Sequence, residues 1–314
     1  MSKKILVTGV NGFVGHHLSR KLHELGHSVI GVGRDDQPAD KNRDFLENYV
    51  SSDLTKFDDV TPIDLTGVDG VIHLAGLANV GMSFEKPAEF IGANTSMAAN
   101  LLQHALSQKS EAIFVVISTG AVYEGKQPMP ITEAEGIVTH NSPYAISKLA
   151  SEYICDYYRS RGLHTVVTRP FNHVGPGQLP GFLVPDLALQ LQKVKSGEAD
   201  EIVVGNLKTK RDYTDVRDVV DAYIALATSD ERPKESTYNV CSGASHSGEE
   251  ILDLLIKAFD FAEPPKVTVD EKRLRPNDPE DIVGSSDRLQ KEFNWHPTIP
   301  LDQTIKDFVA GLDT

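Results

Sequence analysis

The chain has 314 residues, with 31 basic and 45 acidic side chains, and therefore a formal net charge of −14 at pH 7. An acidic surface of this size opposes non-specific binding to nucleic acid or to an anionic membrane. It does not exclude an anionic ligand, because a pocket can be locally basic. Hydrophobic residues make up 40% of the chain, so it can bury a large core without disulfides or a structural metal.

The cysteine pattern and the apolar runs indicate in which cellular compartment the protein is expected. Cys155 and Cys241 lie in apolar stretches and form neither a CxxC nor a Cys/His ligand pattern. We therefore expect two buried thiols in a reducing compartment, and no metal site. The first apolar run, Ile5–Val7, is too short for a signal peptide or a membrane span, and no other segment has that character. These features predict a cytoplasmic protein that binds neither membrane nor nucleic acid.

Short apolar runs alternate with amphipathic stretches in the first half of the chain. Nearly continuous Val, Ile and Leu indicates strands that are buried on both faces. Strands are expected at 4–8, 28–32, 68–74, 112–118 and 165–168, and helices at 14–24, 87–107 and 144–161. This alternation predicts an α/β fold with a doubly wound parallel sheet of the Rossmann type.

The regular alternation of strands and helices ends at about residue 170. Glycine and proline cluster there, and shorter elements follow at irregular spacing. We expect a dinucleotide-binding domain over 1–170 and a smaller substrate-binding domain over most of 171–314. Segments within about 212–240 are expected to return and pack on the sheet.

Three glycines, Gly9, Gly12 and Gly15, follow the first expected strand and open the first expected helix. Glycine suits a backbone that turns tightly and approaches a pyrophosphate, and the helix N-terminus supplies free N–H groups there. Glycines at this spacing can also serve a plain turn. The strand–loop–helix context favours a dinucleotide cofactor.

The end of the second expected strand bears on which dinucleotide is bound. An acidic residue there would hold the ribose hydroxyls of NAD, whereas this chain has Arg34, which can pair with the 2′-phosphate of NADP. Asp35 follows at once and keeps NAD possible, and Arg34 could also be a solvated loop cation. We expect NADP as the cofactor. Asp53, after a third strand position, is expected to contact adenine.

A tyrosine and a lysine four residues apart form the expected proton-transfer pair. Tyr144 and Lys148 lie on one face of an expected helix. A phenol titrates near ~10 on its own. A nearby ammonium and an oxidised nicotinamide would lower that pKa, so Tyr144 could exchange a proton with a carbonyl or hydroxyl. Thr119, at the end of the preceding strand, is expected to hydrogen-bond the reacting oxygen.

These residues together resemble the extended short-chain dehydrogenase/reductase family, in its NAD-dependent epimerase/dehydratase group. The resemblance covers essentially the whole chain. Its motifs are Gly9-Val10-Asn11-Gly12-Phe13-Val14-Gly15, His73-Leu74-Ala75-Gly76, Ser118-Thr119-Gly120-Ala121-Val122-Tyr123, Tyr144…Lys148 and Arg169-Pro170-Phe171-Asn172.

The resemblance implies a role for each matching residue. It implies Thr119, Tyr144 and Lys148 as the catalytic trio. The cofactor-binding residues it implies are Gly9, Asn11, Gly12, Phe13, Val14, Gly15, Arg34, Asp53, Leu54, Leu74, Ala75, Gly76, Tyr144 and Lys148. The substrate-binding residues it implies are Asn172, Val184, Lys193, Arg211 and Arg275. Lys193 is equally compatible with an exposed helix lysine.

The second half is most similar to the branch of the family that acts on GDP-sugars. The similarity rests on the segments 169–178, 210–219 and 274–279. It implies NAD(P)H-dependent reduction of the C4 keto group of a nucleotide-linked 4-keto-6-deoxyhexose, first of all GDP-4-keto-6-deoxymannose. A nucleotide-sugar 4-epimerase with tightly held NAD would use the same catalytic residues and stays an alternative. A non-catalytic cofactor-binding protein is a third, though such proteins often lose the tyrosine or the lysine.

Three positions depart from the family pattern. The dehydratases of the family carry an acidic residue two positions before Tyr123, where this chain has Ala121, so dehydration lacks its usual acid/base group. Glu124 replaces a usual glycine and Gly76 a usual alanine, both near the expected cleft.

The resemblance also implies a homodimer, in which the helices 87–107 and 144–161 pair across a four-helix interface. The alternative is a monomer in which both helices only cover the sheet.

Overall fold

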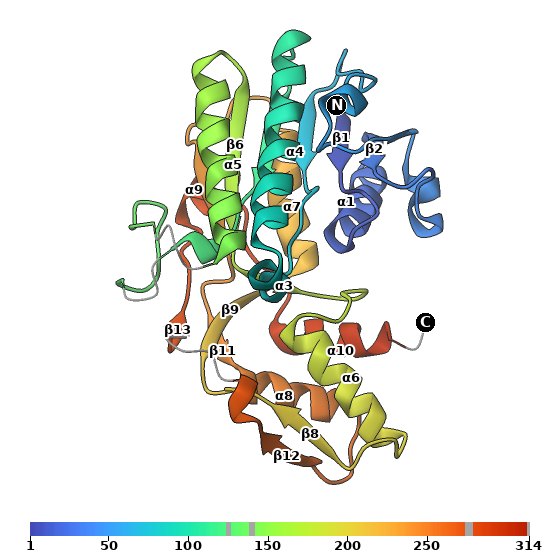
Figure 1. Ribbon diagram of the computed structural model, residues 1–314, viewed down its shortest axis with the longest axis vertical. Coiled ribbons are helices and arrows are strands. Elements are labelled where there is room, and N and C mark those ends of the chain that lie inside the picture. The colour runs from blue at the N-terminus through green and yellow to red at the C-terminus, as the bar shows by residue number, and fades with distance from the viewer. Residues whose placement is uncertain (124–126, 138–141, 274–278, 313–314) are drawn as a thin grey trace.

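The computed structural model describes residues 1–123, 127–137, 142–273 and 279–312. Among these residues, a seven-stranded sheet has the strand order β10-β6-β5-β4-β1-β2-β3, and every neighbouring pair runs parallel (Figure 1). Its strands are β1 Lys4–Thr8, β2 Ser28–Gly33, β3 Asn48–Ser51, β4 Gly70–His73, β5 Ile113–Ile117, β6 His164–Pro170 and β10 Thr237–Val240. The predicted α/β fold with a doubly wound Rossmann-type sheet is confirmed.

Helices cover both faces of this sheet, which explains why its strands are apolar throughout. On one face lie α1 (Phe13–Glu24), α7 (Val216–Ala227) and α9 (Asp287–Phe293), whose side chains share a core with β1, β4 and β5. On the other face α4 (Pro87–Ser107) and α5 (Pro143–Ser160) pack side by side (Figure 1). Burial on both sides removes the alternation that a half-exposed strand would show.

The start and end of α5 follow from local sequence. The Ser142 hydroxyl accepts a hydrogen bond from the Ala145 N–H at 3.1 Å, and Pro143 takes the first helical position, where no N–H is needed. Gly162 lies just beyond the last turn with φ of 104°, a conformation that favours glycine. The helix that carries Tyr144 and Lys148 is therefore fixed at both ends.

A second set of elements packs below the carboxyl end of the sheet (Figure 1). Its helices are α6 Leu183–Lys195, α8 Gly248–Ala258 and α10 Leu301–Ala310, and its strands are β7 Asn172–Val174, β8 Glu201–Val204, β9 Lys210–Asp215, β11 Ser245–Ser247, β12 Lys266–Val269 and β13 Asp281–Ile282. These elements share a hydrophobic core of their own. Short helices complete the described chain: η1 Asp40–Phe45, α2 Phe57–Val60, α3 Val80–Glu85, η2 Gly120–Val122 and η3 Glu271–Arg273.

Both cysteines are buried and unpaired, as predicted, and burial raises the pKa of both thiols. No helix within the described ranges is both long and apolar enough to cross a membrane. In the same ranges, no group of three or more His, Cys, Asp or Glu side chains could hold a metal ion.

Candidate active site

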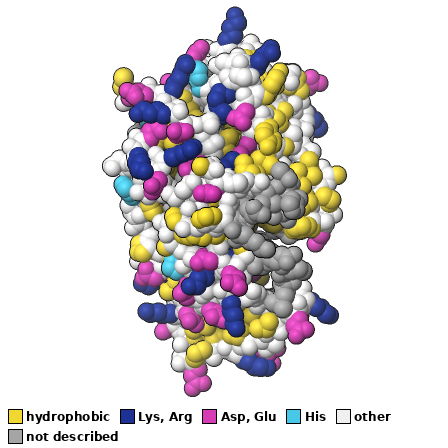
Figure 2. All heavy atoms as spheres, turned by 90° about the vertical axis from the view of Figure 1, so that its left-hand side faces the viewer, with side chains coloured by type: hydrophobic (Ala, Val, Ile, Leu, Met, Phe, Trp, Pro, Cys, Tyr) yellow, Lys and Arg dark blue, Asp and Glu magenta, His cyan; other side chains and the backbone are white. Residues whose placement is uncertain are grey.

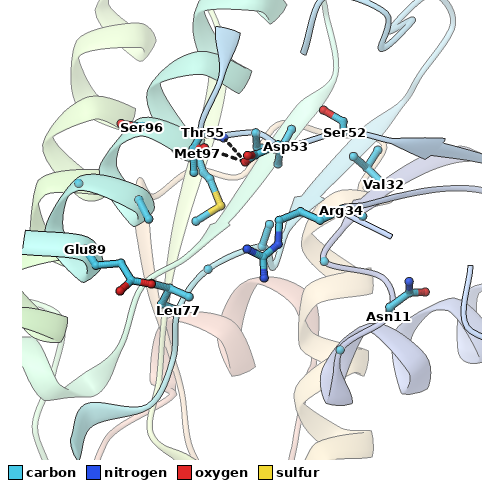
Figure 3. A pocket seen from close by; sticks show the side chains of 18 of the residues that line it. Asn11, Val32, Arg34, Ser52, Asp53, Thr55, Leu77, Glu89, Ser96 and Met97 are labelled. Carbon is cyan, nitrogen blue, oxygen red and sulfur yellow. Dashed lines mark hydrogen bonds between the residues drawn. The ribbon is translucent and has the colours of Figure 1, made fainter. Parts of the chain in front are cut away.

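A cleft of about 580 Å³ opens at the carboxyl ends of the strands, where the chain order changes direction between β1 and β4 (Figure 3). Ligands bind at such a switch point in doubly wound folds. Eight of the residues expected to bind the cofactor line this cleft: Gly9, Asn11, Gly12, Arg34, Asp53, Leu54, Ala75 and Gly76. The structure therefore brings together residues from the loops after four different strands.

The glycine loop is shaped so that side chains would not fit. Gly9 has φ of 69°, and a Cβ there would lie 2.8 Å from the Ala75 nitrogen. A Cβ on Gly15 would lie 2.5 Å from the Gly9 carbonyl oxygen. Gly12 precedes α1 and supplies no side-chain cap, so no N-cap side chain competes with a ligand for the first N–H groups of that helix. This backbone fits the pyrophosphate of a dinucleotide.

Arg34 and Asp35 take different directions at the end of β2. Figure 3 shows Arg34 reaching from the loop into the cleft. The Asp35 carboxylate instead accepts a hydrogen bond from the Asn11 side-chain amide at 2.7 Å. Arg34 is exposed and forms no ion pair with another described residue. Its guanidinium is therefore available to bind a phosphate. From the sequence alone, the neighbouring Asp35 had left the choice between NADP and NAD open.

Asp53 lies on the opposite wall of the cleft, after β3. Its carboxylate accepts hydrogen bonds from the Thr55 hydroxyl at 2.7 Å and the Thr55 N–H at 3.1 Å, as the dashed lines in Figure 3 mark. The bond from the hydroxyl is the largest cause of the lowered pKa of Asp53. Its expected contact with adenine stays a prediction.

The catalytic candidates Thr119, Tyr144 and Lys148 lie together beside the cleft. Lys148 is buried, its ammonium donates to the Ile117 carbonyl at 2.9 Å, and it lies 6.0 Å from the centroid of the Tyr144 ring. Burial lowers the pKa of Lys148 to about 8. The Thr119 side chain lowers the pKa of the Tyr144 phenol.

The pKa of Tyr144 is set differently from the sequence-based expectation. Burial raises the pKa of the phenol, and the Thr119 side chain opposes this rise. The Lys148 ammonium is directed to a backbone carbonyl rather than to the phenol oxygen. In the protein alone, the neighbour that lowers the pKa of Tyr144 is thus the threonine. Lowering by the lysine and a bound nicotinamide stays a prediction for the complex.

Asn94 is a buried polar residue at the site that the sequence analysis missed. Its side-chain amide exchanges hydrogen bonds with the backbone of Leu77 at 2.7 and 3.1 Å, and donates to the Ser147 hydroxyl at 2.8 Å. It thereby joins α4 to the loop after β4 and to α5. The signal that could have found it is an asparagine in the middle of an otherwise apolar helix face.

The expected substrate residues lie in varied settings. Asn172 is exposed on β7, and Lys193 is exposed on α6, the helix on which it was predicted. Arg211 on β9 donates to the Pro279 carbonyl at 2.9 Å. The Val184 side chain is only 2% exposed and packs in the core of the second set of elements, so a ligand could meet its backbone alone. Arg275 lies outside the described residues.

Close neighbours surround Gly76, one of the positions that depart from the family pattern, and Gly120, which precedes another. A Cβ on Gly76 would lie 3.2 Å from the Asn94 oxygen and 3.3 Å from the Lys148 nitrogen. A Cβ on Gly120 would lie 3.1 Å from the Phe171 ring, which is itself buried. Glu124 lies outside the described residues.

Comparison with known proteins gives the family. The family model described as "NAD dependent epimerase/dehydratase family" matches residues 5–241. The chain belongs to this family. Its members among the relatives are enzymes, and the match includes the glycine loop and the Tyr144–Lys148 pair.

Three relatives show the range of activities in the family. A GDP-6-deoxy-D-mannose reductase from Pseudomonas aeruginosa is 33% identical, with 100% of this chain and 98% of that protein covered. The solved structure of RMD from Pseudomonas aeruginosa, complexed with NADPH, has a TM-score of 0.84 at 30% identity, covering 99% of this chain and 98% of that one. A UDP-glucose 4-epimerase from Thermus thermophilus in complex with NAD has a TM-score of 0.84 at 28% identity and covers 99% of both chains.

Proposed function

We propose that this protein is an NADPH-dependent reductase of the C4 keto group of a nucleotide-linked 4-keto-6-deoxyhexose, with GDP-4-keto-6-deoxymannose as the first candidate substrate. The observation that carries the proposal is the 33% identity over the full chain with a GDP-6-deoxy-D-mannose reductase. Arg34 reaches into the cleft and has no ion pair with another described residue, which supports NADPH. NAD is the second cofactor candidate, because a relative is known in complex with NAD.

The absence of a carboxylate at two positions supports a reductase over a dehydratase. Neither Gly120 nor Ala121 can exchange a proton with the sugar, and a Cβ at position 120 would lie 3.1 Å from the Phe171 ring, which would have to shift to admit it. Elimination of water would need an acid/base group beside the sugar. Thr119 and Tyr144 supply hydroxyls only, which suits proton donation to one carbonyl oxygen.

The described side chains can divide the reaction between them. When bound, NADPH supplies the hydride that reduces C4. Tyr144 donates its proton to the C4 oxygen, and Thr119 donates a hydrogen bond to the same oxygen and so holds it near the phenol. Lys148, charged below about pH 8, stabilises the phenolate that remains. Asn172, Lys193, Arg211 and Arg275 are the candidates for holding the nucleotide sugar, the arginines by bidentate contact with the diphosphate.

The test mixes purified protein with NADPH and GDP-4-keto-6-deoxymannose and follows NADPH absorbance. We expect one NADPH to be consumed per sugar, and Tyr144→Phe to lose turnover while it still binds NADPH. UDP- and dTDP-linked 4-keto sugars serve as controls for the base. No loss of NADPH, together with cofactor already bound to the purified protein and interconversion of C4 epimers, would replace the reductase with the epimerase.

The assembly is proposed to be a homodimer that pairs α4 and α5 of two chains. Tyr153 and Tyr157 on the outer face of α5 are 63% and 55% exposed. Figure 2 shows hydrophobic side chains gathered along one edge of this side of the molecule. Aromatic side chains in such a position suit a buried interface. Sedimentation should give twice the chain mass of 34.4 kDa, and Tyr153→Glu with Tyr157→Glu should give the mass of one chain.

The division into a cofactor domain over 1–170 and a substrate domain over most of 171–314 is part of the same proposal. Limited proteolysis with and without NADPH tests it, because the cofactor should protect the first part selectively. A cytoplasmic location is tested by fractionation of the source cells.

A further inference from the structure

A buried ion pair lies behind the catalytic candidates. Arg169 on β6 and Glu152 on α5 form two parallel hydrogen bonds, from Nε to Oε1 at 3.0 Å and from Nη2 to Oε2 at 2.6 Å. Their side chains are 6% and 8% exposed. Burying two charges is costly unless their geometry and their remaining hydrogen bonds are satisfied. A bidentate pair in this place therefore needs a reason beyond stability.

The ion pair holds the segment that carries Thr119 from both sides. On one side, the Ser118 hydroxyl donates to the Glu152 carboxylate. On the other, Arg169 Nη1 donates to the Tyr123 phenol oxygen at 2.9 Å, and its guanidinium lies 4.9 Å from the centroid of the Tyr123 ring. Ser118 and Tyr123 are thus two anchors of this segment. Thr119 directly follows the first and lies four residues before the second.

The same ion pair is built into the helix that carries the tyrosine and the lysine. Glu152 follows Lys148 by four residues and Tyr144 by eight on α5, so all three lie along one side of that helix. Lys148 adds a further link, because it donates to the carbonyl of Ile117, the residue before Ser118. The end of β5 and the face of α5 are therefore joined at successive residues.

Thr119 itself has few restraints of its own. Its hydroxyl accepts a hydrogen bond from the Ala121 N–H at 3.2 Å, and its side chain lowers the pKa of the Tyr144 phenol. Both interactions depend on where the backbone places the residue. That backbone is held through Ser118 and Tyr123.

We propose that the Arg169–Glu152 ion pair is a positioning device that sets the Thr119 hydroxyl against the Tyr144 phenol, acting through Ser118 and Tyr123. The inference rests on the proposed function, in which Thr119 and Tyr144 touch the reacting oxygen. Arg169 and Glu152 are positioning residues, and neither contacts the substrate. A merely structural ion pair would contribute to stability and leave the chemistry of the site alone.

The test cuts the two anchors without breaking the ion pair. Ser118→Ala removes one hydroxyl, Tyr123→Phe removes the other, and the double variant removes both. Ser110→Ala and Tyr238→Phe are the matched controls, because they delete buried hydroxyls of the same kind at the other end of the sheet and on β10. Glu152→Gln tests the pair itself where it folds, as judged by circular dichroism.

We expect the double variant to lower kcat by about 10-fold or more, since small misplacements of reacting groups have effects of this order. KM for the nucleotide sugar and the Kd for NADPH should change by less than about 3-fold, because the binding residues are elsewhere. The pKa of Tyr144 should rise, since the Thr119 side chain in its present place lowers it. Tyrosine labelled with ¹³C at Cζ reports this pKa by NMR, assigned with Tyr144→Phe, whether or not a substrate is at hand.

Unchanged kcat together with an unchanged Tyr144 pKa in the double variant would overturn the positioning role. Equal losses in the control variants would do the same, because any buried hydroxyl would then suffice. Failure of the proposed function looks different: the unmodified protein would not consume NADPH, or Thr119→Ala would keep full turnover. If the protein epimerises instead, the comparison is made on that reaction, which uses the same three residues.

Discussion

Arg34 offers the sharpest test of how the cleft chooses its cofactor. The perturbation is Arg34→Ser, which removes the guanidinium and keeps a small polar side chain in the loop after β2. Because Arg34 is exposed and unpaired among the described residues, no internal ion pair is broken and the fold should be unaffected. The substitution therefore reports on the ligand rather than on stability.

The size of the effect follows from the contact that is lost. A hydrogen bond to a charged group contributes about 1.5–3 kcal/mol, and the exposure of Arg34 favours the lower part of that range. A loss of 1.4 kcal/mol is tenfold in affinity. The Kd for NADPH should therefore rise by about 10- to 40-fold, whereas the Kd for NADH should stay within about 2-fold. Asp35 should not compensate, since its carboxylate is held by the Asn11 amide at 2.7 Å.

The assay is titration of NADPH and NADH fluorescence at two salt concentrations. Arg20→Ser is the control, because it makes the same change of charge on the exposed face of α1, where Arg20 pairs with Glu24 at 2.8 Å. The reasoning is refuted if Arg34→Ser raises the Kd for NADPH and the Kd for NADH equally. It is also refuted if Arg20→Ser raises the Kd for NADPH as much as Arg34→Ser does. An unchanged NADPH affinity would make Arg34 a solvated loop cation.

Three further predictions concern backbone fit and a buried charge. Gly15→Ala places a Cβ 2.5 Å from a carbonyl oxygen, so it should cost about 1–3 kcal/mol in urea unfolding and weaken NADPH binding; normal values in both titrations would contradict this. Gly120→Ala should lower the free energy of unfolding by a similar amount, because its Cβ would lie close to Phe171. Gly92→Ala, in α4 with no neighbour within 4 Å, should instead raise it by about 0.5–1 kcal/mol. A change of the same sign in both variants would contradict this. The folded pKa of Lys148, about 8, lies below its ordinary 10.5, so the unfolded chain binds more protons between these values. The unmodified protein should therefore gain up to about 3 kcal/mol relative to Lys148→Met as pH rises from 8 to 10.5, and a constant difference in urea unfolding would rule this out.

The strands and helices near the cofactor cleft could be predicted because the apolar pattern of each segment agrees with its place in the sheet. Lys4–Thr8 and Pro87–Ser107 were predicted with the bounds that the structure has. Apolar runs bounded by glycine loops leave few alternatives in a doubly wound sheet. The glycine spacing located the cleft for the same reason, since its backbone must come close to the loop after β4.

Other parts depend on contacts between distant segments, which a single sequence does not reveal. Nothing around Glu152 or Arg169 in the chain says that the two meet, because they are brought together only when α5 packs on β6. Val184 was expected at the substrate, yet its side chain fills the core of the second set of elements. Shorter elements were expected after about residue 170, but β7, β9, β11 and β13 were not placed in the sequence, because no strand–helix alternation marks them and each pairs with a segment far away in the chain.

The reversal of strand order between β1 and β4 has a consequence for how such proteins diversify. The two loops that follow these strands leave the sheet in opposite directions, so the opening between them exists whatever side chains line it. Substitutions of exposed side chains at its rim can then change what binds there with little cost in folding. Arg34 and Glu89 are exposed residues that line this opening, whereas Gly9 and Gly15 cannot accept a Cβ. Relatives named as a reductase, an epimerase and a dehydratase can thus share one backbone arrangement around this opening.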